Sequence, residues 1–455
     1  MPWAGPATLT QAPTVPGTAA PGGTEPSWPA SSSASRGEMV TVSATLAANE
    51  ALARRRERGE PVLPLAFGEA GLPVHPLLTA ELASAASLGG YGPVAGAERL
   101  RAAAAGYWTR RSLPTSPDAV IAGPGSKALL FATLLATGTD VAMPRPSWVS
   151  YAAQATLIGA RPQFVPTVNG QGGCCDPEAL DDAVSVARKA GRRIGTVLVT
   201  LPDNPTGTLA SPDVIRALCE VAERHDLTII SDEIYRDLVH DPATPVLSPA
   251  QIAPDRTVVT TALSKNLAVG GWRLGVARMP EGPAGTALRE RLLGIASEIW
   301  SAPTGPVQQA AAVAFDEPPV LTQHIAQSRS LHAMVCREAA RLCTEAGLTV
   351  PAPQAAFYLY PDFEPWRARL AGAFGVRTGS NLSGLLLERY GAGTLPGSAF
   401  GEDATALRLR LATGLLYGET AAQREQALTA AEPLRLPWIA GAMARLAEIL
   451  ADLAA

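Results

Sequence analysis

SKNLAVGGWRLG, residues 264–275, is the stretch around which this 455-residue chain is organised. The apolar run RTVVTT (256–261) just before it predicts a strand that ends close to Lys265. Burial at such a strand end helps an amine to lose its proton, as it must before it forms a Schiff base with an aldehyde. The glycine pair before Arg273 lets the backbone approach an anion, to which the guanidinium offers donors. Together these features suit pyridoxal phosphate, and an ordinary surface lysine is the alternative that this stretch alone leaves open.

Strand and helix patterns alternate around this stretch. Seven short apolar runs predict strands, and helical patterns separate most of them; the runs are residues 119–122, 141–143, 163–166, 196–201, 228–231, 258–261 and 275–278. Near-continuous apolar strands between helices indicate an α/β fold with a mostly parallel, seven-stranded sheet that helices cover on both faces. Ligands of such sheets bind at the carboxyl ends of the strands. We therefore expect the functional residues just after the strands.

Two clusters that follow strands have the chemistry to bind a pyridine ring. In LPDNPTGT (201–208), a rigid turn can direct the amide of Asn204 at a ligand oxygen, and in SDEIY (231–235) Asp232 and Tyr235 lie three residues apart. A carboxylate can keep a pyridinium nitrogen protonated, which makes the ring an electron sink, and a phenol can bond to the ring's phenolic oxygen. A plain turn for Asn204 and a helix N-cap for Asp232 are the alternatives.

Two further clusters suit a phosphate and a flat ring. In GPGSKALLF, the residues Gly125, Ser126 and Lys127 open a predicted helix, whose free N–H groups and dipole favour a phosphate. In PRPSWVSY, Trp148 can stack on a heteroaromatic ring. A simple helix cap and ordinary core packing are the alternatives when each cluster is taken alone. Five clusters of this kind, all at strand ends, are hard to obtain by accident.

Composition narrows the classes of function. The net charge of −4 argues against nucleic acid as a partner. Five cysteines in a long chain argue against a disulfide framework and for a reducing compartment, and the five scattered histidines show no metal-binding spacing. No apolar run reaches the ~18 residues that span a bilayer, and the first residues lack the pattern of a signal peptide. We predict a cytoplasmic protein without a metal site.

The chain length predicts more than one domain. Residues 1–40, rich in Pro, Gly, Ala, Ser and Thr, predict a disordered leader. Residues 41–88 are expected to form an N-terminal arm and part of a small domain, residues 89–315 a large cofactor-binding domain, and residues 316–455 the rest of the small α+β domain. Within the large domain, the adjacent glycines and cysteines at 172–175 predict a loop.

With these clusters in this order, the chain resembles the class I/II aminotransferase family, the aspartate-aminotransferase-like branch of fold type I pyridoxal phosphate enzymes, over about residues 43–418. The resemblance implies that Lys265 is the Schiff-base lysine and that Asp232 is the partner of the pyridine nitrogen. The phenolic oxygen and the ring face would be contacted by Asn204, Tyr235 and Trp148. Of these, Asn204 and Trp148 would also contact the substrate.

The resemblance also implies phosphate, subunit and substrate contacts. The phosphate-binding motifs contain Gly125, Ser126, Lys127, Ser264 and Arg273. Tyr91, in YGPVAG, matches a tyrosine that reaches the phosphate of the neighbouring subunit, which implies a homodimer with shared active sites. Arg408 matches the arginine that grips the substrate α-carboxylate, a task that suits bidentate guanidinium geometry. Gly68 matches a glycine whose backbone lies near the substrate.

Four departures from the family pattern accompany these matches. Ala262 stands where many members carry a hydroxyl residue, Arg410 where a small serine is common, and Ala355 where glycine is frequent. The segment FGEAGLP replaces the usual Gly-Glu-Pro-Asp pattern. A second acidic group of a substrate is a possible ligand for Arg410 or Arg145, but we expect surface positions for both. These departures leave the substrate and the reaction type open.

Three hypotheses of function follow. The first is an aminotransferase for an α-amino acid and a 2-oxo acid, in which Lys265 moves a proton at the substrate Cα. The second is a lyase, a β- or γ-replacement enzyme, or an enzyme that cyclises its substrate or forms carbon–carbon bonds, with the same lysine, aspartate and arginine. The third is a non-catalytic sensor, which would normally carry a basic DNA-binding domain ahead of the fold, whereas the leader here is short and nearly uncharged. We favour the first.

Overall fold

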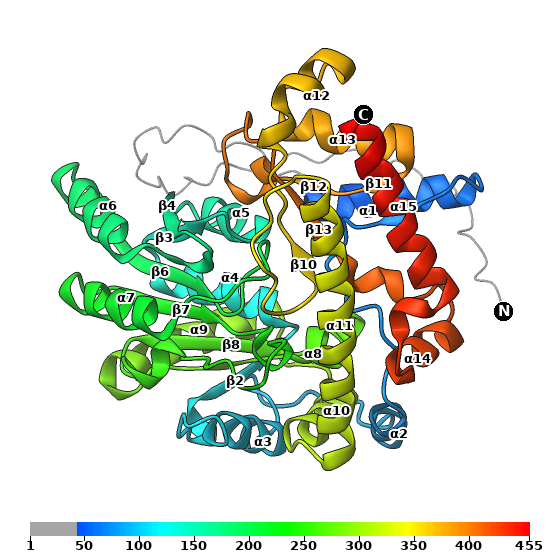
Figure 1. Ribbon diagram of the computed structural model, residues 1–455. Coiled ribbons are helices and arrows are strands. Elements are labelled where there is room, and N and C mark those ends of the chain that lie inside the picture. Colours follow the sequence, from blue (N-terminus) through cyan, green and yellow to red (C-terminus); the bar gives the residue numbers. More distant parts are fainter. Residues whose placement is uncertain (1–42) are drawn as a thin grey trace, which may run out of the picture. The chain divides into compact units, whose positions relative to one another are not determined.

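The main sheet of the computed structural model, which describes residues 43–455, has eight strands (Figure 1). In their order across the sheet, these are β2 (Val120–Gly123), β9 (Gly275–Arg278), β8 (Thr257–Ala262), β7 (Thr228–Asp232), β6 (Ile194–Thr200), β3 (Asp140–Arg145), β4 (Pro162–Val168) and β5 (Gln171–Cys175). The predicted leader at residues 1–40 lies outside the described residues.

The sheet is mostly parallel, as predicted. Neighbours from β8 through β7, β6 and β3 to β4 run parallel, whereas β9 is antiparallel to β2 and β8, and β5 is antiparallel to β4. All seven predicted strands are present, but β5 is an eighth strand where a loop was expected. A Cβ on Gly173 would lie 2.1 Å from the carbonyl oxygen of Thr200. The glycines that argued against a strand are therefore needed, because they let β5 pack closely on the end of β6.

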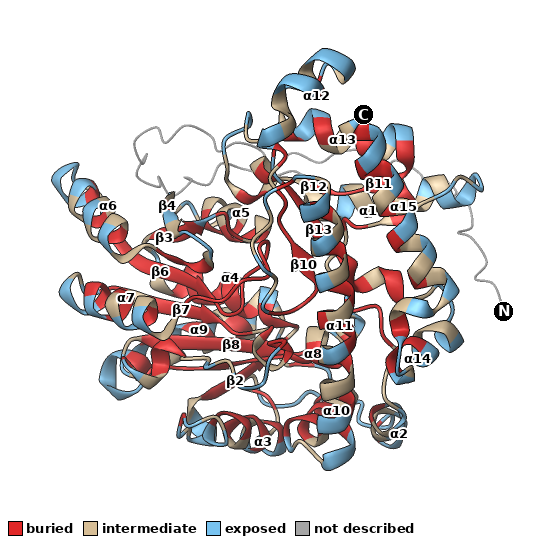
Figure 2. Cartoon of the chain, in the orientation of Figure 1, coloured by how far each residue is buried: buried red, intermediate tan, exposed pale blue. Residues whose placement is uncertain are grey.

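Helices cover both faces of the main sheet. They are α3 (Glu98–Thr109), α4 (Ser126–Thr137), α5 (Val149–Leu157), α6 (Pro177–Lys189), α7 (Pro212–Arg224), α9 (Gly282–Ile299) and α10 (Gly305–Phe315). Alternate residues of β6 contact the helix layers on opposite faces of the sheet. Val197 and Val199 pack in one apolar cluster with α6 and α7, and Leu198 packs in another with α4 and α5. Both faces of the strands are thus buried (Figure 2), which explains their near-continuous apolar sequences.

A smaller antiparallel sheet lies in the C-terminal part of the chain. Its order is β10 (Tyr358–Leu359), β13 (Leu409–Ala412) and β12 (Leu395–Pro396), and a separate parallel pair joins β1 (Leu63–Pro64) to β11 (Ala392–Gly393). The surrounding helices are α1 (Ala44–Glu57), α11 (Pro319–Glu345), α12 (Arg367–Phe374), α13 (Gly379–Tyr390), α14 (Ala421–Thr429) and α15 (Pro437–Ala454). Helix α2 (Pro76–Ser84) packs instead against α10.

The N-terminal segment packs with this C-terminal part. Leu63 and Leu65 share an apolar core with residues of α11, β10, β13 and α15. Contacts join all the described residues in one unit, so the domain boundaries at residues 88 and 315 stay predictions. Within residues 43–455, no helix combines the length and the apolar character required to cross a membrane.

Candidate functional site

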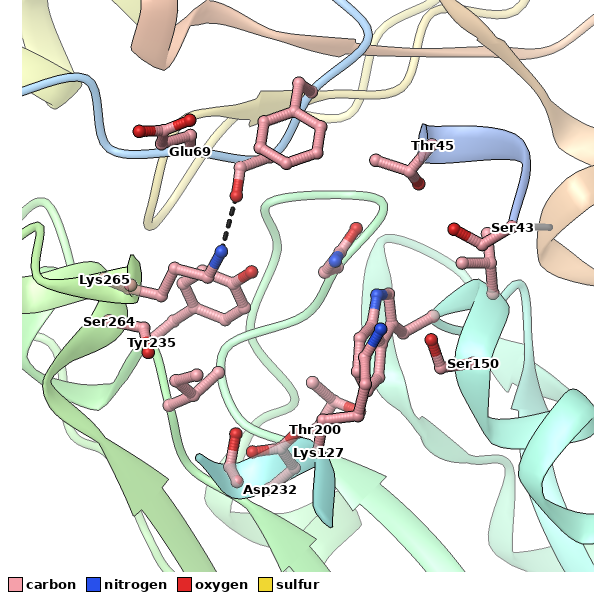
Figure 3. Close-up of a pocket in the computed structure, with 18 of the residues that line it drawn as sticks. Ser43, Thr45, Glu69, Lys127, Ser150, Thr200, Asp232, Tyr235, Ser264 and Lys265 are labelled. Atoms are coloured by element: carbon pink, nitrogen blue, oxygen red, sulfur yellow. Dashed lines mark hydrogen bonds between the residues drawn. The ribbon is translucent and has the colours of Figure 1, made fainter. Parts of the chain in front are cut away.

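A cavity of about 610 Å³ lies beyond the carboxyl ends of β6, β7 and β8 (Figure 3). These strands are adjacent and in register, with Thr200 opposite Asp232 and Asp232 opposite Thr260, so the segments that follow them converge. Ten predicted site residues line the cavity: Gly68, Ser126, Lys127, Trp148, Asn204, Asp232, Tyr235, Ser264, Lys265 and Arg273. Three do not: Tyr91, Gly125 and Arg408.

Lys265 presents its amine to this cavity. It lies in α8 (Leu263–Asn266), a single turn that begins directly after β8. Its Nζ donates a hydrogen bond of 2.5 Å to the carbonyl oxygen of Gly68, the contact dashed in Figure 3. Burial lowers the pKa of the amine to about 8, and the cation of Arg410 adds to the lowering. Near neutral pH a useful fraction of this lysine is therefore the free base, as imine formation requires.

Asp232 is held at the end of β7 by two hydroxyl donors. Its carboxylate accepts a 2.9 Å bond from Tyr151 Oη and a 3.2 Å bond from Thr260 Oγ1, and Tyr151 is also bonded to Thr200. Burial raises the pKa of Asp232 to about 6, although these hydrogen bonds oppose the rise. Tyr151 was not among the predicted site residues, although it stands three residues after Trp148 and so one helical turn away.

Two cations face the start of α4. Gly125, at φ 87°, caps this helix, and Ser126 is its first residue. A Cβ on Gly125 would lie 2.4 Å from Arg273 Nη2, so the glycine lets Arg273 approach the start of α4, although Gly125 itself does not line the cavity. We call Ser126, Lys127 and Arg273 the phosphate cradle. Among residues 43–455, neither Lys127 nor Arg273 is paired with a carboxylate, and burial followed by the nearby Arg273 lowers the pKa of Lys127. A helix N-terminus beside two unpaired cations fits a phosphate dianion.

An aromatic wall stands beside this cradle. The Trp148 ring lies 5.0 Å from Lys127 Nζ and packs edge-on against Tyr151 at 5.2 Å between centroids. Asn204, another residue of the cavity lining, accepts a 3.1 Å bond at Oδ1 from Arg410 Nη1. Because that bond uses the amide oxygen, the amide nitrogen of Asn204 is left to donate to a ligand.

Arg410 lines the cavity, in contrast to the expected surface position. It is buried in β13 and also donates from Nη2 to the carbonyl oxygen of Ala66. Its Nε has no partner in the structure, and no carboxylate of the described chain pairs with it. Burial lowers its pKa. The surface prediction for Arg410 is therefore wrong, and the cavity holds a buried cation that lacks an anion.

Arg408, the residue predicted to grip the substrate, does not line the cavity. Its guanidinium is ion-paired with Asp362 at 2.9 Å and with Glu402 at 2.8 Å, and 44% of its side chain is exposed. This placement contradicts the prediction for Arg408. Side chains two residues apart on a strand share a face, so the pattern RLRLAT could not show which arginine extends over the cavity.

Tyr358 is a cavity residue that the sequence analysis did not identify. Its Oη lies 2.7 Å from Tyr235 Oη, and a Cβ on Gly68 would lie 2.4 Å from it. Gly68 is thus required by close packing, which agrees with a backbone that lies at the site. No sequence signal marked Tyr358, because FYLY reads as an ordinary apolar strand.

Tyr91, predicted to serve the neighbouring subunit, is 96% exposed in this single chain. Its role in a dimer stays a prediction.

Comparisons with known proteins agree with this geometry. Residues 62–422 match the family model described as aminotransferase class I and II. The chain is 33% identical over 401 residues to an aspartate aminotransferase of Geobacillus stearothermophilus, a match that covers 86% of this chain and 97% of the relative. It is 31% identical over 341 residues to a probable aspartate/prephenate aminotransferase of Thermus aquaticus, covering 73% and 85%.

A solved structure supports the fold. The aspartate aminotransferase of Thermus thermophilus with maleate superposes with a TM-score of 0.75 at 24% identity, over 90% of this chain and 97% of that one. The family and the relatives favour amino-group transfer over elimination, replacement or carbon–carbon bond formation. The chain therefore belongs to the aminotransferase class I and II family and is a pyridoxal-phosphate-dependent aminotransferase.

Proposed function

We propose that Lys265 is the lysine that carries the cofactor during transfer of an amino group between an α-amino acid and a 2-oxo acid. The observation that supports this most strongly is the Lys265 amine, with a pKa lowered to about 8, in one cavity with Asp232 and the unpaired Arg410. The chain has three lysines. Lys189 is exposed in the last turn of α6 and Lys127 belongs to the phosphate cradle, which leaves Lys265 for the covalent bond.

The remaining cavity residues would hold and polarise the cofactor. Pyridoxal phosphate, when bound, supplies an aldehyde that joins amines and a ring that accepts electrons from the substrate. Ser126, Lys127 and Arg273 bind the phosphate, with Gly125 and Ser264 shaping the cradle. Trp148 packs on the ring, and Asn204 and Tyr235 donate to its phenolic oxygen. Asp232 keeps the ring nitrogen protonated, a task for which Tyr151 and Thr260 orient its carboxylate.

Arg410 binds the α-carboxylate of the substrate in this proposal. A buried guanidinium without an anion is costly, and a substrate carboxylate would complete the pair. Lys265, once free, would move the proton at the substrate Cα, for which a pKa of about 8 suits both its protonated and its free-base forms. The backbone of Gly68 forms part of the cavity wall, and its carbonyl oxygen accepts the hydrogen bond from the Lys265 amine.

The subunit arrangement and location are also proposals. The exposed Tyr91 supports a homodimer in which this tyrosine reaches the phosphate of the second active site. A cytoplasmic location rests on the composition alone. The substrates remain an α-amino acid and a 2-oxo acid as classes, and aspartate, for which the curated relatives are named, is the first amino donor to test.

Reductive trapping tests the lysine assignment directly. The loaded protein is treated with borohydride and digested, and the peptide that carries the cofactor is identified by mass. We expect the label on Lys265 alone, loss of the visible absorbance in Lys265→Ala, and an unchanged spectrum in the control Lys189→Ala. Label on Lys127 or Lys189 would refute the assignment.

A half-reaction tests the type of chemistry. Incubation with single amino acids, aspartate first, should convert the bound cofactor to its amine form and release an equal amount of 2-oxo acid. Product formation with the aldehyde form retained would instead indicate elimination or replacement.

A further inference from the structure

Tyr358 forms part of the cavity wall without a task in the proposed machinery. It is buried in β10, and its hydroxyl oxygen lies 2.7 Å from that of Tyr235. On another side it touches Gly68, whose carbonyl oxygen accepts the hydrogen bond from Lys265. The Tyr358 hydroxyl therefore lies beside both the phenol that would contact the cofactor and the backbone that holds the amine.

Each hydroxyl of the tyrosine pair has one proton to donate, so only one of the two can donate to the other. Burial raises the pKa of both phenols, and that of Tyr235 rises well above its ordinary value. The Arg410 guanidinium lies 5.1 Å from the centroid of the Tyr358 ring and opposes the rise in both phenols. Because Tyr235 would use its single proton on the phenolic oxygen of the cofactor, the shared bond would be donated by Tyr358 and accepted by Tyr235.

We propose that Tyr358 is a positioning residue that donates to Tyr235 and so strengthens the hydrogen bond from Tyr235 to the phenolic oxygen of the cofactor. This inference rests on the proposed function of the site. In a chain of hydrogen bonds, each bond polarises the next. The phenolic oxygen carries its fullest negative charge when the link between Lys265 and the cofactor has lost its proton, and a stronger donor favours that unprotonated form. Tyr358 therefore lowers the pKa of the lysine-bound cofactor.

Absorbance titration of the loaded enzyme measures this pKa without any turnover. Tyr358→Phe removes the hydroxyl and keeps the ring, and we expect the pKa of the bound cofactor to rise by about 0.3 to 1 pH unit. Tyr360→Phe is the matched control, because Tyr360 is a buried tyrosine two residues further on that does not line the cavity. Its titration should coincide with that of the wild type.

A double substitution tests the route through Tyr235. If Tyr358 acts through that phenol, Tyr358→Phe adds no further shift in a Tyr235→Phe background. A wild-type pKa in Tyr358→Phe, or a full shift that persists without the Tyr235 hydroxyl, overturns the proposal while the assignment of Lys265 stands. Absence of a lysine-bound absorbance band in the wild type would overturn the proposed function and this inference with it.

Discussion

Arg410→Gln should abolish most of the transferase activity, and Arg408→Gln should leave it nearly intact. Two of the five N–H groups of Arg410 are used within the chain, by Asn204 and by Ala66, so three remain for a substrate carboxylate. Hydrogen bonds between charged groups contribute about 1.5–3 kcal/mol each. Loss of two such bonds amounts to about 3–6 kcal/mol, or roughly 10²- to 10⁴-fold in kcat/KM.

Arg408 is a control of the same residue type, two residues before Arg410 and directly before β13. Its two ion pairs, with Asp362 and Glu402, lie at a partly exposed position. Exposed pairs of this kind contribute about 0–1 kcal/mol to stability, so Arg408→Gln should change kcat/KM by no more than about twofold.

Steady-state kinetics with the best amino donor measures both effects, and thermal unfolding of each variant verifies that it is folded. Because glutamine preserves part of the side-chain volume at position 410, a loss of activity in a folded Arg410→Gln protein reports on substrate contact. A loss of activity of 10²-fold or more in Arg408→Gln, with activity retained in Arg410→Gln, would refute the assignment of Arg410 to the substrate carboxylate.

Two further substitutions probe packing and charge in the cavity. Gly68→Ala places a Cβ against the Tyr358 hydroxyl and should cost about 1–3 kcal/mol of stability, with a large loss of kcat/KM. The control Gly372→Ala in α12 has open space around the new Cβ and should unfold at the wild-type temperature or slightly above. Equal unfolding temperatures and activities of the two variants would contradict close packing at Gly68. In the cofactor-free protein, burial raises the pKa of Asp232 to about 6, above its unfolded value, so the folded state binds the extra proton and loses stability as pH rises from about 4 to 6. Urea unfolding should therefore show that the stability of Asp232→Asn relative to wild type increases as pH rises from about 4 to 6. If the difference in the free energy of unfolding between the two proteins stayed constant over that range, Asp232 would not be the titrating group.

The amino-acid sequence by itself determined the fold class and most of the site. Apolar strands separated by helices indicate a parallel sheet covered by helices on both faces. The carboxyl ends of such strands lie at the same edge of the sheet, regardless of the conformation of the loops. For that reason Asn204, Asp232 and Lys265, each placed after a different strand, were correctly expected in one cavity. The short strand β5 was missed because its two glycines argue locally against a strand, and only the approach to the end of β6 requires them.

Tertiary structure alone decided between Arg408 and Arg410. Arg408 directly precedes β13 and Arg410 lies within it, and the choice depends on which of the two positions lies at the cavity rather than beside Asp362 and Glu402. The same is true of Tyr151 and Tyr358, whose partners Asp232 and Tyr235 lie far away in the sequence. Sequence patterns report periodicity and local chemistry, whereas contacts between distant segments exist only once the strands have paired and the loops have packed.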